Sequence, residues 1–194
     1  MRADRFAPNK IEMNYMSLKL KITGCFILFL FVSILPMNDA LAQQRNVSDL
    51  QAAILLNAIK YIDWPDDHSR ERFVMTISGD DELYAALEQA VQSKQKDGKK
   101  ITVSKLDVQR VDASTCDLFF LGNDAMSSFE KARDLFKARP TLFVTSKESC
   151  AKKGSALNFV IVNGKMVIEI NEPVIREGGF KVSGALLSMA SIIK

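Results

Sequence analysis

The stretch LNFVIVNGKMVIEINEPVIREGGFKVSGALLSMASIIK, residues 157–194, determines how the fold closes. Two runs rich in strand-forming residues, Leu157–Val162 and Met166–Ile170, flank Asn163-Gly164, a dipeptide that tolerates the positive φ angles of a type I′ turn. These runs predict a β-hairpin. Because side chains alternate along a strand, the second run has one face with Met166, Ile168 and Ile170, and another with Val167, Glu169 and Asn171.

Helix signals follow the hairpin directly. Asn171 stands where an N-cap is expected, ahead of an acid and a proline in the first turn, and Gly178-Gly179 supplies the stop. Ser183 is then expected to cap a closing helix. Its buried stripe is predicted from residues that recur at helical spacing, namely Leu186, Leu187, Ala190 and Ile193.

The N-terminus predicts export. Lys19 and Lys21 precede an apolar run, Ile22–Leu35, that is short for a membrane span and is followed by the small-residue site Asp39–Ala42. We expect residues 1–42 to be a secretory signal peptide cleaved after Ala42. Residues 43–48 would then be a short N-terminal extension, and residues 49–194 a single domain in the periplasm.

Charge gives no indication of nucleic-acid binding. The whole chain carries a net charge of +3, and most of this excess lies in the predicted signal peptide. The lysine-rich run Lys94–Lys100 is interpreted as a solvated helix end and turn.

A helix is predicted to begin at Ser48 or Asp49 and to end at Trp64-Pro65, because proline disfavours helical geometry in the residue before it. Residues on one helical period are Leu50, Ala53, Ile54, Asn57, Ala58, Tyr61 and Ile62. Trp64 at the helix exit either plugs the end of the core or offers an anchor to a partner.

Strands and helices then alternate along the chain. Strands are expected at Phe73–Ser78, Ile101–Leu106, Asp117–Leu121 and Thr141–Thr145, with helices over Glu82–Lys94 and after a cap at Asn123 or Asp124. This order predicts an α/β fold with a mostly parallel sheet, helices on both faces, a C-terminal β-hairpin and a closing helix.

The chain offers few residues for catalysis. Asp80, Asp81 and Asp124 are expected at the carboxyl ends of parallel strands, where open α/β sheets bind ligands, but helix capping explains them equally well. The single histidine, His68, lies in a polar loop, and no set of residues has nucleophile-base or metal-ligand spacing. The sequence therefore predicts no catalytic residue, no cofactor and no metal site.

Glu169 is unusual because it interrupts an apolar strand. It is expected on an exposed face, in a salt bridge to Arg176 or Lys181, or, with Asn171 and Trp64, on a surface that a partner protein contacts.

Two cysteines remain after the predicted cleavage, Cys116 and Cys150, in a compartment that oxidises thiols. They are candidates for a disulfide. The geometry argues against it, since parallel neighbouring strands would place the two residues near opposite ends of the sheet.

Several segments, in order, resemble the YfiR family of bacterial periplasmic proteins. They are NAIKYIDWP (57–65), FVMTISGD (73–80), CDLFFLG (116–122), VIEIN (167–171) and GGFKVSGALLSMA (178–190). The resemblance implies a regulator that represses an inner-membrane diguanylate cyclase through its periplasmic region, lowering cyclic di-GMP and biofilm formation. It also implies an outer-membrane lipoprotein as a further partner, and a homodimer is a further expectation.

The resemblance raises one doubt and leaves one alternative. Many relatives have a cysteine in the first strand that pairs with the one opening the central strand; this chain has Thr76 there, which puts redox sensing through that bond in doubt. The alternative function is a periplasmic sensor that binds a small ligand in the strand-end crevice and serves a histidine kinase or a transport system.

Overall fold

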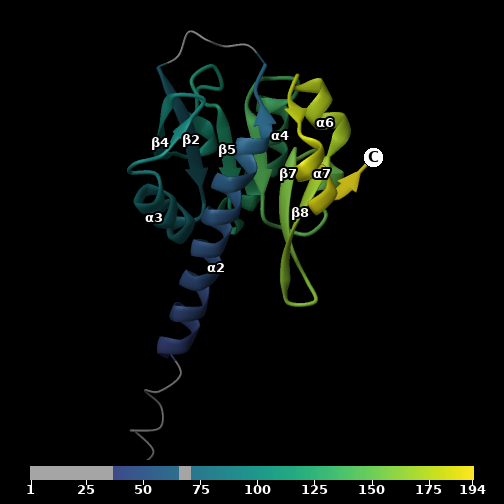
Figure 1. The fold of residues 1–194 in the computed structure, drawn as a ribbon. Helices are drawn as coiled ribbons and strands as arrows, with labels where there is room; N and C mark the ends of the chain where they lie inside the picture. The colour runs from purple at the N-terminus through teal and green to yellow at the C-terminus, as the bar shows by residue number, and fades with distance from the viewer. Residues whose placement is uncertain (1–36, 66–70) are drawn as a thin grey trace, which may run out of the picture. The chain divides into compact units, whose positions relative to one another are not determined.

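The fold is built on a mixed sheet (Figure 1). In the computed structural model, which describes residues 37–65 and 71–194, eight strands form this sheet in the order β10-β8-β7-β6-β5-β2-β4-β3. Their bounds are β2 (Arg72–Ser78), β3 (Gln95–Lys96), β4 (Lys99–Lys105), β5 (Leu118–Leu121), β6 (Leu142–Thr145), β7 (Leu157–Val162), β8 (Lys165–Asn171) and β10 (Ser191–Ile193). All of them lie in the compact unit Arg45–Lys194.

Strand directions confirm the predicted fold class. Neighbours from β4 through β2, β5 and β6 to β7 are parallel, as are β8 and β10, while β7–β8 and β3–β4 are antiparallel. The β7–β8 register pairs Val162 with Lys165 around Asn163 (φ 51°) and Gly164 (φ 73°), which confirms the predicted hairpin turn.

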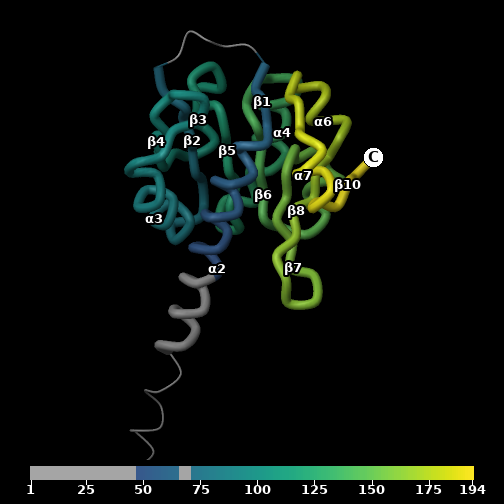
Figure 2. Tube along the Cα trace, in the orientation of Figure 1, coloured from purple at the N-terminus to yellow at the C-terminus, as the bar shows by residue number. Residues whose placement is uncertain are grey.

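The central strands contribute to two apolar cores. On β5, Leu118 and Phe120 face a core shared with α2 (Met37–Ala58) and α3 (Asp81–Ala90), whereas Phe119 and Leu121 face a second core. That second core includes residues of α4 (Phe129–Phe136) and α5 (Cys150–Lys153). Helices therefore cover both faces of the sheet, and Figure 2 traces the path of the chain between them.

Capping predictions are largely confirmed. Asp80 Oδ1 accepts from Leu83 N (2.9 Å), Asn171 caps α6 (Glu172–Glu177), and Ser183 caps α7 (Gly184–Met189). The predicted cap at Asn123 or Asp124 is wrong. Both residues lie inside a 3₁₀ helix, η3 (Asn123–Ser128), because backbone bonds from Gly122 N to Ser78 O and from Asp124 N to Gly79 O fix the chain there.

The closing helix is shorter than predicted. It ends at Met189, and the chain continues as β10, which pairs in parallel with β8 from Ser191 opposite Glu169 to Ile193 opposite Asn171. Leu186 is the buried residue of α7, while Leu187 is exposed. Pairing with the open edge of β8 gives the backbone groups of these last residues hydrogen-bond partners.

The predicted face of the first helix is only partly correct: Ala58 and Ile62 are buried, but other residues of the predicted stripe are exposed. Leu50 is half exposed and Tyr61 is exposed, while the buried positions include Ala52, Leu55 and Ile59. The helix starts at Met37, so Ser48 and Asp49 lie within it and do not begin it. Beyond it come η1 (Ile59–Tyr61) and the short strand β1 (Ile62–Asp63), which pairs antiparallel with β9 (Lys181–Val182).

The lysine-rich run differs from the prediction as well. It forms the antiparallel pair β3–β4 around Asp97 (φ 52°) and Gly98 (φ 78°), and Lys96 is buried. The predicted signal-peptide core and the loop around His68 lie outside the described residues.

Candidate functional site

Trp64 is fixed at the junction of the N-terminal helix and the C-terminal segment. Its indole Nε1 donates to Asp117 O (3.0 Å), and its ring makes edge-to-face contacts with Phe73 (centroids 4.9 Å apart) and Phe180 (5.6 Å). The Lys96 ammonium lies 5.4 Å from the ring centroid. The partly buried Trp64 therefore packs against the core, which agrees with the core-plug interpretation.

Glu169 ends a polar network inside the sheet. Its Oε2 accepts from Asn158 Nδ2 (2.7 Å), the residue directly opposite on β7, and the described residues include no ion pair from Glu169 to Arg176 or Lys181. Asn158 Oδ1 in turn accepts from Thr145 Oγ1 (2.7 Å), which lies 2.9 Å from Ser155 Oγ. Asn158, Thr145 and Ser155 are fully buried, so these bonds satisfy groups that would otherwise be costly to bury.

Asn171 is committed to the fold. Its Nδ2 donates to Ala151 O (2.7 Å), its Oδ1 accepts from Val174 N (3.0 Å), and its side chain is buried. The three residues nominated from the sequence thus have separate surroundings: Trp64 contacts the aromatic rings, Glu169 contacts Asn158, and Asn171 contacts the start of α6 and α5. A surface containing them would offer a partner little of Asn171.

Both cysteines are free thiols in the structure. Cys116 Sγ donates to Leu118 O (3.1 Å), and burial raises its pKa to about 11, an effect that hydrogen bonding with Thr76 partly offsets. Burial also raises the pKa of Cys150, whose Sγ lies 3.9 Å from Met126 Sδ. Because the thiolate is the reactive form, neither thiol is poised for redox chemistry at neutral pH.

The crevice at the strand ends is filled by backbone. A Cβ placed on Gly79 would lie 2.3 Å from Ala125 N, and one on Gly122 would lie 2.2 Å from Gly79 O, so the loops after β2 and β5 are in direct contact. Both glycines are required for this close approach. A ligand therefore has no room between these two loops, at the position where the crevice was expected.

Two of the three acids near the crevice, Asp80 and Asp81, stabilise the fold. Asp80 caps α3, and its burial raises its pKa, with the nearby Asp124 carboxylate as a smaller contribution. Asp81 forms an ion pair with Lys105 (2.6 Å). No group of three or more His, Cys, Asp or Glu side chains within residues 37–65 and 71–194 is arranged to hold a metal ion.

The exposed apolar side chains were not identified from the sequence. In the C-terminal segment they are Ile161 and Val162, close to the hairpin turn, and Leu187 and Met189 on α7. Hydrophobic periodicity assigned Leu187 to the core. The Asn158–Glu169 pair was also missed, although a hairpin centred on Asn163-Gly164 places these two polar residues opposite each other.

A known protein family matches nearly the same residues as the compact unit Arg45–Lys194. The sequence model of the family DUF4154, described as YfiR/HmsC-like, matches residues 48–191. No curated protein matches the chain. Among solved structures, the ABC domain in complex with L-Trp from Streptococcus pneumonia is similar, with a TM-score of 0.51 and 13% identity over 71% of this chain. The match spans 59% of the length of that structure and shows a similar fold.

None of the helices in the described part of the chain combines the length and the apolar composition needed to cross a membrane.

Proposed function

Because the chain belongs to the YfiR/HmsC-like family, whose members are periplasmic regulators of diguanylate cyclase, we propose that it binds and represses an inner-membrane diguanylate cyclase. Repression would lower cyclic di-GMP and biofilm formation. The observation that carries the proposal is the family match over residues 48–191, which includes almost all of the described domain. The protein would act by binding, without catalysis.

We place the contact with the cyclase on the exposed apolar side chains of the C-terminal segment. Ile161 is 61% exposed and Met189 is 65% exposed, although both are large apolar residues. The two side chains lie at the end of β7 and on α7, and partner binding that covered them would remove their apolar area from water.

The experiment is a direct binding measurement between the purified protein and the periplasmic region of the cyclase. Ile161→Glu and Met189→Glu are each expected to weaken binding about tenfold or more, because each introduces a charge into an apolar contact. Leu106→Glu is the matched control, since Leu106 is also exposed (39%) but follows β4, toward the opposite edge of the sheet. Equal affinities for all three variants would reject this surface.

Two further partners follow from the same proposal. An outer-membrane lipoprotein would relieve repression, and a homodimer could use the same apolar side chains. Sedimentation of the protein alone distinguishes self-association from cyclase binding: a Met189→Glu variant that loses a dimer but keeps full cyclase affinity would assign the surface to the dimer.

The alternative function, a small-ligand sensor that uses the strand-end crevice, is less well supported. The Gly79–Ala125 and Gly122–Gly79 contacts leave that crevice filled. The bound L-Trp of the similar Streptococcus domain is a property of that protein, and the 13% identity supports a shared fold alone.

A further inference from the structure

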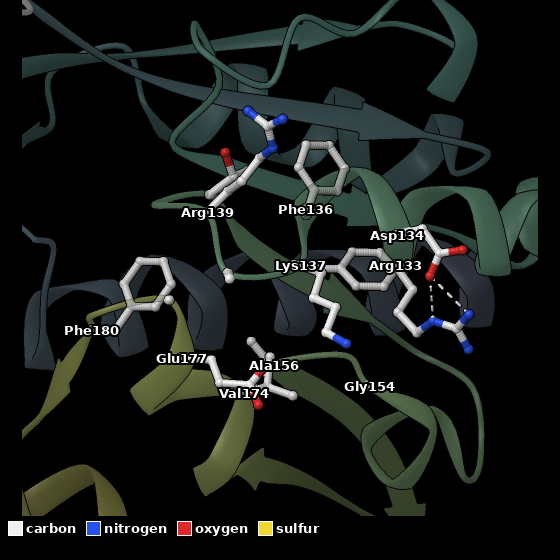
Figure 3. A pocket seen from close by; sticks show the side chains of 14 residues that line it. Arg133, Asp134, Phe136, Lys137, Arg139, Gly154, Ala156, Val174, Glu177 and Phe180 are labelled. Carbon is white, nitrogen blue, oxygen red and sulfur yellow. Dashed lines mark hydrogen bonds and ion pairs between the residues drawn. The ribbon is translucent and has the colours of Figure 1, made fainter.

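A pocket of 290 Å³ lies away from the strand-end crevice, between the end of α4, the start of β6 and the end of α6 (Figure 3). It exists because β7 begins opposite Val144 and the backbone pairing reaches only to Phe143, whose O accepts from Ala156 N (2.8 Å), so Leu142 at the start of β6 has no strand beside it on that side. The end of α6 approaches there instead, and a Cβ on Gly178 would lie 3.1 Å from Arg139 O. The hollow is a consequence of the sheet's stagger.

Aromatic and aliphatic side chains form much of the wall. Phe136 and Phe143 contribute from the α4 side, and Ala156, Val174 and Phe180 contribute from the opposite side. The volume is at the lower end of the range for small-molecule sites, which are typically apolar with a few polar groups that orient the ligand. The pocket is therefore suited to a small ligand with an apolar body.

The charged side chains at the rim of the pocket differ in whether they form ion pairs. Arg133 forms ion pairs with Glu130 and Asp134, so its charge is balanced. In the described part of the chain, no ion pair is formed by Lys137 or Arg139, and the remaining acid of the lining is Glu177. Figure 3 shows Lys137 extending from the end of α4 into the space toward Ala156 and Val174. Glu130 beside Arg133 and Asp112 near Arg139 offset much of this basic charge, which leaves Lys137 as the lining ammonium without an ion pair in the described part of the chain.

We propose that this pocket binds a small organic anion, with its carboxylate at Lys137 and its apolar body against Phe136, Phe143 and Phe180. A charge-assisted bond to an ammonium is stronger than one between neutral groups, and the apolar wall reduces the competing solvation. The same wall disfavours a fully hydrated ion such as inorganic phosphate. This inference does not depend on the proposed repression of a cyclase.

The structure provides an internal reporter for such binding. Phe180 lines the pocket, and its ring lies edge-to-face on Trp64 at 5.6 Å. Trp64 is the single tryptophan of the chain. A ligand that contacts Phe180 is expected to change the emission of Trp64, so fluorescence and calorimetry give two independent readouts.

The test uses phenylacetate and its neutral isostere phenylacetamide, titrated into the purified protein. Phenylacetate is expected to bind about 5- to 10-fold more tightly than the amide. Lys137→Met should weaken phenylacetate binding about 5- to 10-fold and abolish the preference for the acid. Lys131→Met is the control, because Lys131 is an exposed residue of α4, the helix that ends just before Lys137, and is not part of the lining.

Several results would overturn the inference. They are equal affinities for acid and amide, an undiminished affinity in Lys137→Met, or no binding of phenylacetate at millimolar concentration. Inorganic phosphate binding as tightly as phenylacetate would also reject it, since it would indicate a simple phosphate site. Lys137 is exposed, so its substitution is not expected to affect folding, and equal unfolding temperatures of both variants check this.

Discussion

Gly79→Ala tests whether the strand ends are closed as described. Gly79 has φ +70°, and an added Cβ would lie 2.3 Å from Ala125 N and 2.5 Å from Ala125 Cβ. Gly98 is a matched control, because it has φ +78° but nothing within 4 Å of an added Cβ. Both substitutions incur the same cost of placing alanine in the left-handed region, and Gly79 alone adds steric overlap.

The expected difference follows from these two terms. The backbone term is about 1–2 kcal/mol for each variant. At Gly79 the loops must also separate by about 1 Å to restore ordinary contact, and overpacking of this kind costs about 1–3 kcal/mol more. We therefore expect Gly98→Ala to lower the free energy of unfolding by about 1–2 kcal/mol and Gly79→Ala by about 2–5 kcal/mol.

Urea denaturation followed by Trp64 fluorescence measures both values. Equal losses of stability in the two variants would refute the reasoning, because they would mean that the loops after β2 and β5 do not touch. The crevice would then have room for a ligand, and the small-ligand sensor would regain its site.

Three further predictions concern buried polar groups. Asn158→Ala should lower the free energy of unfolding by about 2–3 kcal/mol, because three hydrogen bonds are lost. The control Asn57→Ala, on the exposed side of α2, should change it by less than ~0.5 kcal/mol. Equal effects of the two substitutions in denaturation would reject the network. Cys116, with a pKa of about 11, should resist iodoacetamide at pH 8 in the folded protein and react readily in urea, and rapid labelling of the folded protein would contradict its burial. Asp80→Asn keeps a capping oxygen but removes a carboxylate whose pKa is raised above 3.8 in the folded protein. Ionisation of Asp80 therefore costs the folded wild type more than the unfolded chain, so the variant should be more stable than the wild type at pH 7 and not at pH 3. Denaturation at both pH values checks this.

The parts of the fold that could be predicted are those set by local chemistry. Asn163-Gly164 determines the hairpin turn, and its register alone places Asn158 opposite Glu169. Asn171, Ser183 and Asp80 act as the caps that their positions indicate. In each case the residue type and its immediate neighbours decide the conformation, so no tertiary information is needed.

The parts that could not be predicted depend on tertiary packing. The first helix has apolar residues on two faces, and only the position of the sheet decides that Leu55 and Ile59 are buried while Leu50 is exposed. Ser191–Ile193 continues the period of α7, but the open edge of β8 makes it a strand. The hairpin at Asp97-Gly98 is different, because its turn dipeptide was present in the sequence and the lysine-rich composition obscured it.

The residues of the candidate site also divide into those that the sequence could identify and those that depend on tertiary packing. Cys116 and Thr76 could be assigned from the resemblance, and the structure places them within hydrogen-bonding reach. The exposed apolar residues and the pocket beside Lys137 result from strand lengths and stagger, which periodicity does not specify.

Repression of a diguanylate cyclase is tested most directly by measuring cyclic di-GMP in cells. The account predicts that deletion of this gene raises cyclic di-GMP, that the wild-type gene restores the low level, and that the rise disappears when the cyclase gene is also deleted. Unchanged cyclic di-GMP after deletion, with the cyclase expressed, would contradict it.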